Sequence, residues 1–182
     1  KGDYAAFGCG KYTADSKGVY TICTCITEII DFGIVQNIPE DAFGNGLISC
    51  DKLTSVVIPE SVISIGAYAF HNCSGLTNVV LPNGLKIVGN RAFYIKNTLV
   101  KTLTIPVSVT TVDEYSFAMY GLTVVNILAE TPPNSPNTAG SYILGNPNSD
   151  TFAVEKIIVD NRVESIVADR VFPLVKIHRV FL

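Results

Sequence analysis

The sequence is poor in the residues that carry catalytic chemistry. Its 182 residues include two histidines, one methionine and no tryptophan. Charged residues make up 16% of the chain, whereas an average globular protein has about 25%. Because acid–base and nucleophilic catalysis depend on ionisable side chains, we expect this protein not to be an enzyme.

Charge and long apolar runs are also in short supply. The 13 Lys and Arg residues are outnumbered by 16 Asp and Glu residues, for a net charge of −3, and they form no basic cluster. This composition argues against nucleic-acid binding, which needs clustered cations. No apolar run approaches the roughly 18 residues of a membrane-spanning helix. The first residues, KGDYAAFGCG, lack the pattern of a signal peptide, so the protein either never had one or has lost it; a cell-surface location would require that a secretion or lipoprotein signal was removed.

The cysteines form neither a complete disulfide framework nor a recognisable metal site. Five is an odd number, which argues against full pairing. Cys23 and Cys25 are the closest pair, but no second pair or nearby histidine completes a tetrahedral ligand set. We therefore expect no metal and no cofactor. For Cys9 and Cys25, a disulfide and two free thiols both stay open.

What the sequence has instead is an internal repeat. Phenylalanine recurs at Phe43, Phe70, Phe93 and Phe117, in steps of 27, 23 and 24 residues. The longer first step reflects four extra residues before Cys50, which must loop out. Repeats of this length stack into a solenoid, in which each unit contacts its neighbours. One proline column and two apolar columns keep the same register: Pro59, Pro82 and Pro106; Ile26, Leu53, Leu76, Val100 and Leu122; Ile29, Val56, Val79, Leu103 and Val125.

One unit reads as a short strand followed by turns. In residues 53–59, the apolar residues Val56 and Ile58 alternate with outward positions, which is the period of a strand. Stacked units should align these strands in a parallel sheet with a spacing of about 4.8 Å. Beyond the strand, we expect Gly66 to permit a bend and residues 69–70 to form a helical turn with the phenylalanine pointing inward.

Three cysteines belong to the repeat. Cys23, Cys50 and Cys73 each stand three residues before the leading apolar position, and Asn97 and Met119 hold that place in later units. Free cysteine is among the most buried residue types. We therefore expect these three thiols to be buried, reduced and free of metal.

The repeats form the middle of one solenoid domain, residues 1–182. We expect an N-terminal cap with a hairpin over 1–22, repeats over 23–130 and an irregular loop over 131–153, which is rich in Pro, Asn, Ser and Gly. A degenerate last repeat and C-terminal cap follow over 154–182, with a short helix from Arg162 and a closing strand within 175–182. The register of the last repeat rests on five positions: Val154, Ile157, Val159, Val163 and Ile166.

The string C-x-x-L-x-x-V-x-I-P-x-x-V-x-x-I-G-x-x-A-F-x-x-C, from Cys50 to Cys73, resembles the BspA-like class of leucine-rich repeats. The resemblance covers residues 23–172; residues 1–22 and Asp160, which stands where proline is expected, depart from it. It implies a mainly β leucine-rich-repeat solenoid, with a parallel sheet on one face, turns and short helical turns on the other, and caps at both ends. Members resemble one another in lying on or outside bacterial cells, and several are implicated in adhesion.

The outward strand positions are the one surface that the repeat builds by necessity. They carry no charge and mix hydroxyl, amide and β-branched groups, which suits a protein or glycan partner. Together with this surface, the family resemblance implies an extracellular or cell-surface module that binds a host matrix protein, another microbial surface protein or a glycan, and we expect it to be a monomer. The alternative is a structural spacer within a larger surface protein. The expected partner-binding residues are Ser55, Val57, Asn78, Val80, Thr102, Thr104, Val124 and Asn126.

Overall fold

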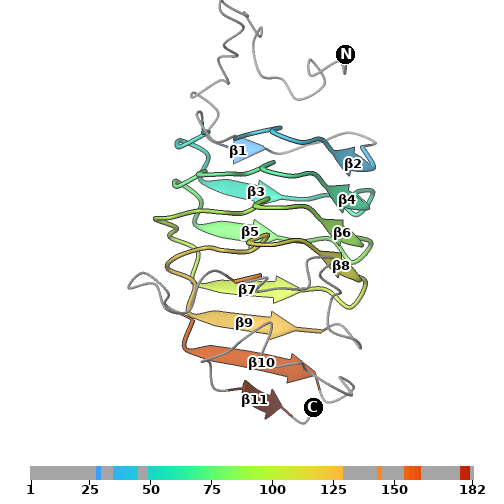
Figure 1. The fold of residues 1–182 in the computed structure, drawn as a ribbon, viewed down its shortest axis with the longest axis vertical. Coiled ribbons are helices and arrows are strands. Elements are labelled where there is room, and N and C mark those ends of the chain that lie inside the picture. The colour runs from blue at the N-terminus through green and yellow to red at the C-terminus, as the bar shows by residue number, and fades with distance from the viewer. Residues whose placement is uncertain are drawn as a thin grey trace, which may run out of the picture.

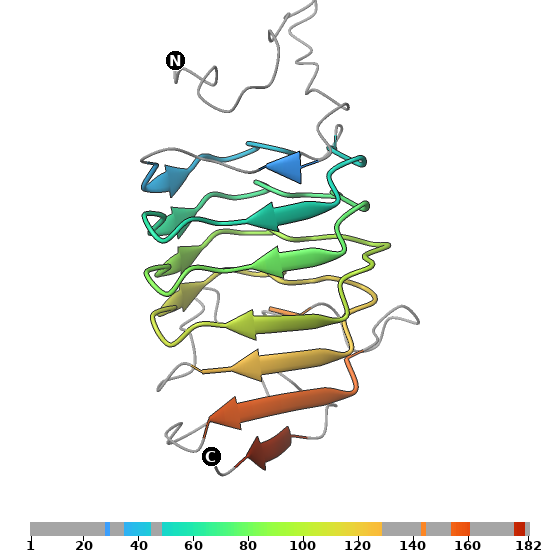
Figure 2. The same cartoon turned by 180° about the vertical axis from the view of Figure 1, so that it is seen from behind.

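The chain coils into a stack of rungs, and their strands line two sides of the molecule (Figure 1). The view from behind shows the same two columns of strands running along the long axis (Figure 2). This computed structural model describes residues 28–29, 35–44, 49–128, 143–144, 154–160 and 177–180.

Two sheets form one side, and we call them the front sheets. The first joins β1 (Glu28–Ile29), β3 (Ser55–Val57) and β5 (Asn78–Val80). The second joins β7 (Thr102–Ile105), β9 (Val124–Ile127), β10 (Lys156–Asp160) and β11 (Ile177–Val180). All pairings within them are parallel. The predicted parallel solenoid is confirmed.

The other side is a single sheet, which we call the rear sheet. It joins β2 (Asn37–Ile38), β4 (Ser64–Ile65), β6 (Ile87–Val88) and β8 (Thr111–Val112) in parallel. This second set of strands was not predicted from the sequence.

The register of the strands follows the apolar columns. Ile29 pairs with Val56, Val56 with Val79, and Leu103 with Val125. Val56, Leu103 and Val125 are fully buried, because alternate strand residues point to the same face. The columns read from the sequence therefore form the core between the two sides.

The four phenylalanines form a stack through the core. Phe43, Phe70, Phe93 and Phe117 are all fully buried. The ring centroids of successive pairs lie 4.9, 4.9 and 5.8 Å apart. The backbone beside them is also linked from rung to rung, since the N–H of Phe70 donates to the carbonyl of Ala92 at 2.8 Å and that of Phe93 to Ser116 at 2.8 Å.

The turns that hold these phenylalanines are not helical, which corrects the expectation of helical turns. No helix occurs among the described residues. Two residues before each phenylalanine, the backbone is left-handed: Tyr68, Arg91 and Tyr115 have φ angles of 56°, 51° and 56°, and Asp41 has 59°. A right-handed helix cannot pass through such a residue.

Gly66 and Gly89 allow the backbones of adjacent rungs to approach closely, and neither is needed for a special backbone conformation. A Cβ atom on Gly66 would lie 2.5 Å from the backbone nitrogen of Glu40, and one on Gly89 would lie 2.7 Å from that of Ala67. Neither glycine has a positive φ. Glycine is therefore present because adjacent rungs leave no room for a side chain here.

The cysteine column holds in part. Cys50 and Cys73 are buried and free, as expected. Asn97, however, is exposed, and the buried apolar side chain in that turn is Ile95, which forms a bridge with Met119. The turn after Phe93 is one residue longer than the turn after Phe70. The residue three positions before Val100, Asn97, therefore lies outside the core.

The C-terminal rungs keep the predicted register where the structure describes them. Ile157 pairs with Val125, and β11 lies within the segment expected to be a closing strand. Ile143 and Leu144 are buried, and Ile143 accepts a hydrogen bond from the N–H of Phe117 at 2.9 Å. The described part of the chain has no helix that could span a membrane. Several expectations lie outside the described residues: the cap over 1–22, Cys9, Cys23, Cys25, Val163, Ile166 and the helix from Arg162.

Candidate functional site: the strand face and its cleft

The eight residues expected to bind a partner all lie on the outer side of the front sheets, which we call the strand face. Exposure alternates along the strands, so the neighbours of each buried residue point outward. Val57 is 50% exposed and Val80 is 44% exposed. Asn78, Thr102 and Thr104 are exposed as well, whereas Ser55, Val124 and Asn126 are half-buried.

The strand face has no charged side chain at these eight positions. Its polar groups are hydroxyls and amides, and two of them are joined, since the Asn126 Nδ2 atom donates to the Thr104 Oγ1 atom at 3.2 Å. This link fixes side chains on adjacent strands β7 and β9. The face therefore combines neutral hydrogen-bonding groups with exposed aliphatic ones.

The strand face is interrupted between β5 and β7. The Val80 carbonyl accepts a hydrogen bond from the N–H of Ile58 at 3.1 Å, so it points toward β3. The adjacent backbone groups of Val79 and Leu81 must then point toward β7, because successive strand residues direct their N–H and C=O groups to opposite edges. No pairing joins β5 to β7.

The opposite edge of this break is equally open. The Ile105 carbonyl accepts a hydrogen bond from Leu128 at 3.0 Å, so the backbone groups of Thr102 and Thr104 point toward β5. Cα atoms of the two strands still approach within 8 Å. Two strands separated by a third lie about 9.6 Å apart, so the break is too narrow to hold an inserted strand.

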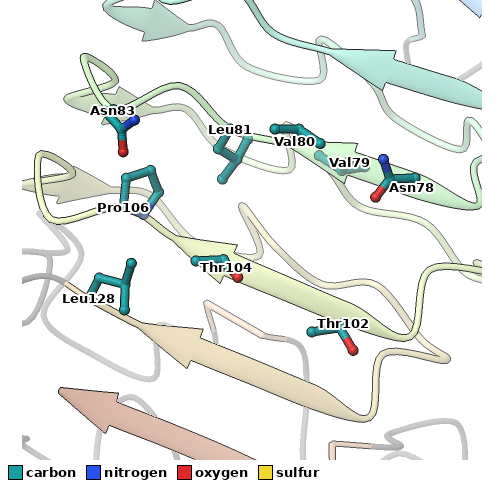
Figure 3. Close-up of a pocket in the computed structure, with 9 residues that line it drawn as sticks. All are labelled: Asn78, Val79, Val80, Leu81, Asn83, Thr102, Thr104, Pro106 and Leu128. Atoms are coloured by element: carbon teal, nitrogen blue, oxygen red, sulfur yellow. The ribbon is translucent and has the colours of Figure 1, made fainter. Parts of the chain in front are cut away.

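A cleft of about 360 Å³ lies over this break. Thr102 and Thr104 line one side, and Asn78, Val79 and Val80 line the other (Figure 3). Leu81, Asn83, Pro106 and Leu128 complete its lining. The lining is uncharged, with apolar surface framed by amides and hydroxyls, which is the usual character of a binding pocket.

The break slightly opens the core beneath it. Leu81 is 9% exposed and Val79 is 6% exposed, whereas Leu103, at the inward position that corresponds to Val79, is fully buried. A ligand in the cleft would therefore contact part of the apolar core as well as surface side chains.

The turns that lead into the front strands differ in length. The leading apolar residue follows its phenylalanine by six residues at Leu76, by seven at Val100 and by five at Leu122. The longer turn leads into β7 and places Leu99, three residues before Thr102, in solvent, 57% exposed. The break thus coincides with the longest of these three turns.

Sequence reasoning found the central residues of the cleft but missed the cleft itself. Asn78, Val80, Thr102 and Thr104 line it as well as belonging to the predicted set. Leu81, Asn83, Pro106 and Leu128 were not predicted. The unequal steps of the leading column do not predict the break, because β1 and β3, and β7 and β9, pair across unequal steps as well.

The described residues offer little for metal or redox chemistry. They contain no group of three or more His, Cys, Asp or Glu side chains that could hold a metal ion. Cys73 donates its thiol hydrogen to the Phe43 carbonyl at 3.5 Å. Burial, followed by the nearby Cys50, raises the pKa of Cys73 above its usual range. A protonated, buried thiol is a poor nucleophile.

Comparison with known proteins agrees with this geometry. The model of the BspA type leucine-rich repeat region matches six copies over residues 36–172. No curated protein matches the chain. A leucine-rich cell surface protein from Faecalibacterium prausnitzii is 21% identical, with a TM-score of 0.56 over 89% of this chain and 40% of its own. A leucine-rich repeat protein from Bacteroides ovatus is 23% identical, with a TM-score of 0.49 over 76% of this chain and 34% of its own. The chain thus spans less than half of either protein.

Proposed function

Because this chain belongs to the BspA-type leucine-rich repeat family, we propose that it is a non-enzymatic binding module that holds a protein partner on its strand face at a bacterial cell surface. The observation that carries the proposal is the uncharged cleft between β5 and β7. Repeat solenoids use extended surfaces of this kind to bind partners.

The composition of the strand face supports a protein partner. The cores of protein–protein interfaces are depleted in charge, as this face is. Val57 and Val80 supply exposed apolar area, and the amides and threonines supply neutral hydrogen bonds. The cell-surface location rests on the resemblance to surface proteins of this repeat type.

The position of the cleft also favours this use. It lies between β5 and β7, with β3 on one side and β9 on the other. Binding energy concentrates at the centre of an interface, where water is excluded. Side chains that line the cleft should therefore contribute more than those on the outer strands.

An array of matrix proteins, microbial surface proteins and glycans, probed with this chain, tests the proposal. Once a protein binder is found, Val80→Arg combined with Thr104→Arg should weaken binding at least tenfold, because both side chains are exposed at the cleft. Binding by the unaltered chain should change little with salt, since the eight predicted residues carry no charge to screen.

The matched control is Ile63→Arg combined with Ile87→Arg. These residues are 37% and 46% exposed, and Ile87 belongs to the rear sheet, so the control adds the same charge away from the cleft. Circular dichroism should show both variants folded. Equal binding by the two double variants would refute the proposal. Binding to glycans alone would change the class of partner, and failure to bind any component would favour the structural spacer.

A further inference from the structure

A second cluster of surface side chains lies on the turns that follow the rear sheet. Tyr68, Arg91 and Tyr115 occupy the same place in three successive turns, two residues before each phenylalanine. Tyr94 packs beside them, with its ring centroid 6.0 Å from that of Tyr115 in an edge-on contact. All four side chains are partly exposed. We call these four residues the Tyr–Arg cluster.

Arg91 is held at the centre of the cluster by the two flanking tyrosines. Its Nη1 atom donates to the Tyr68 hydroxyl at 3.0 Å. Its Cζ atom lies 5.3 Å from the ring centroid of Tyr115 and 6.0 Å from that of Tyr68. Contacts with tyrosines from both neighbouring rungs orient the guanidinium before any ligand arrives.

The guanidinium keeps donors available. Its recorded hydrogen bonds, to Tyr68 and at 3.4 Å to Asn90, both use Nη1. Within the described part of the chain, Arg91 forms no ion pair with a carboxylate. The Nε and Nη2 edge of a guanidinium matches the two oxygens of a carboxylate.

The carboxylate of Glu114 would compete with a ligand carboxylate for the positive charge of Arg91. The hydrogen bond with Tyr68 raises the pKa of Arg91, burial opposes it as the second-largest effect, and Glu114 adds a smaller contribution that raises it. Glu114 lies on the adjacent rung, where its backbone carbonyl accepts a hydrogen bond from the Arg91 N–H at 3.1 Å, so its carboxylate partly neutralises the field of Arg91. A ligand carboxylate would have to overcome this repulsion.

Neither the backbone nor the core explains why these residues are large. Each of Tyr68, Arg91 and Tyr115 has a left-handed backbone, a conformation that glycine adopts freely and bulky residues adopt at a cost. Asp41 has the same conformation in the first described turn, so the turn does not need an aromatic ring. The side chains also lie outside the core. Tyrosine with arginine is, however, the combination enriched at the centres of protein interfaces.

We propose that the Tyr–Arg cluster is a second binding site, separate from the strand face, which receives an Asp or Glu side chain of a protein partner. The carboxylate binds the Nε and Nη2 atoms of Arg91. Aliphatic groups beside it pack on the rings of Tyr94 and Tyr115. A single guanidinium framed by rings suits a single carboxylate, whereas a nucleic-acid backbone needs several cations.

Two capped tripeptides of equal shape test the site: acetyl-Leu-Glu-Leu-amide and acetyl-Leu-Gln-Leu-amide. Each is titrated into the protein with ¹⁵N-labelled arginine, and the Arg91 Nε–H resonance is followed by NMR. The glutamate peptide should shift this resonance to saturation in the millimolar range. The glutamine peptide should bind at least tenfold more weakly.

Two substitutions with opposite expected effects separate recognition from a structural role. Arg91→Gln, followed through the tyrosine ring resonances, should abolish binding of the glutamate peptide. Glu114→Gln should strengthen binding severalfold because it removes the competing charge. Lys52→Gln makes the same charge change as Arg91→Gln at an exposed residue paired with Asp51, and it should leave binding unchanged.

Three outcomes would overturn the proposal. Equal binding of the two peptides would remove the carboxylate from recognition. Weaker binding after Glu114→Gln would contradict the electrostatic argument even if Arg91→Gln fails to fold. Binding of methyl N-acetylneuraminate at the same resonance, without binding of the glutamate peptide, would assign the site to acidic sugars. The site should survive the double substitution at Val80 and Thr104, so its test is independent of the strand face.

Discussion

The front and rear sides of the solenoid are built from the same rungs, yet only the rear sheet is continuous. At the level where β5 and β7 are unpaired, β6 and β8 pair in register, with Ile87 opposite Thr111. From the last outward residue of the front strand to the first residue of the rear strand, the chain takes seven residues in each of three rungs: Val57 to Ser64, Val80 to Ile87 and Thr104 to Thr111. The segment from each rear strand to the next front strand varies in length, because the turn after the phenylalanine varies. The continuous rear sheet thus follows segments of equal length, whereas the interrupted front side follows segments of unequal length.

The size of an insertion matters as much as its presence. The turn between Phe43 and Cys50 is longer by several residues than its successor, yet β1 and β3 pair. An antiparallel bridge between Gly44 and Ser49 closes that insertion, and the Cys50 N–H donates to the Phe43 carbonyl at 3.0 Å. Among the described residues no such bridge closes the turn with the single extra residue before Val100, and the strand that follows it, β7, is not paired with β5.

Among the variants that test this comparison, Phe93→Ala should lower the free energy of unfolding the most. Phe93 stacks on both Phe70 and Phe117 and so links rungs on both sides of the break. Removal of a buried phenylalanine typically costs about 3–5 kcal/mol. Phe70→Ala, in the unbroken part, should cost as much in urea denaturation. A loss below about 1 kcal/mol for Phe93→Ala would mean that the stack does not hold the rungs together across the break.

Gly89→Ala should have the next largest effect, because it would wedge the continuous rear sheet apart. The added Cβ atom would lie 2.7 Å from the backbone of Ala67, and overpacking of this kind costs about 1–3 kcal/mol. Gly84→Ala is the matched control, since its nearest atom, the Glu60 carbonyl oxygen, is 3.1 Å away. Thermal denaturation that ranks the two variants equally would contradict the close approach.

Amide hydrogen exchange should distinguish the two sides directly. The N–H groups of Thr102 and Thr104 face the break, whereas the N–H of Thr111 in the rear sheet donates to the Lys86 carbonyl at 3.1 Å. We expect the first two amides to exchange at least about tenfold faster than those of Leu103 and Thr111. Equal protection of Thr104 and Leu103 would show that the front sheets join in solution.

Ser116→Ala should have the smallest effect, and the opposite sign. Ser116 lies in the turn before Phe117, at the place held by Ala69 and Ala92 in earlier turns, and its buried Oγ atom has no hydrogen-bond partner among the described residues. Removal of an unsatisfied buried hydroxyl should stabilise the protein by about 1 kcal/mol. A lower denaturation midpoint would indicate that the hydroxyl contributes to packing or bonding in this turn.

The sequence predicted the features that depend on periodicity. The apolar columns, the parallel front strands and the phenylalanine stack all follow from residues that recur at nearly fixed spacing. The rear sheet was harder to recognise because each of its strands has only two residues, too few to show alternation. The left-handed turns have no sequence signature here, since Asp41, Tyr68 and Arg91 share no propensity for that conformation.

The candidate site was predictable only in its outward residues. Alternation along a strand identifies Val80 and Thr104 as exposed, but a cleft arises from the displacement of one strand against another. Similarly, Tyr68, Arg91 and Tyr115 lie more than twenty residues apart in sequence. They come together because the turns before the buried phenylalanines stack on one another. These turns were expected to be helical, and no function was predicted for their outer surface.

The interrupted front face has a mechanical consequence. A tensile load along the stack would cross the level of the break through the rear sheet, the turn hydrogen bonds and the phenylalanine stack. Because these links lie to one side of the molecule, the load would be off-centre and would bend the coil, with the unpaired strands β5 and β7 moving apart first. The width of the cleft, and hence the grip on anything bound there, would respond to force. If such a solenoid is tethered at one end and pulled at the other, its affinity for a ligand in the cleft would depend on the applied force.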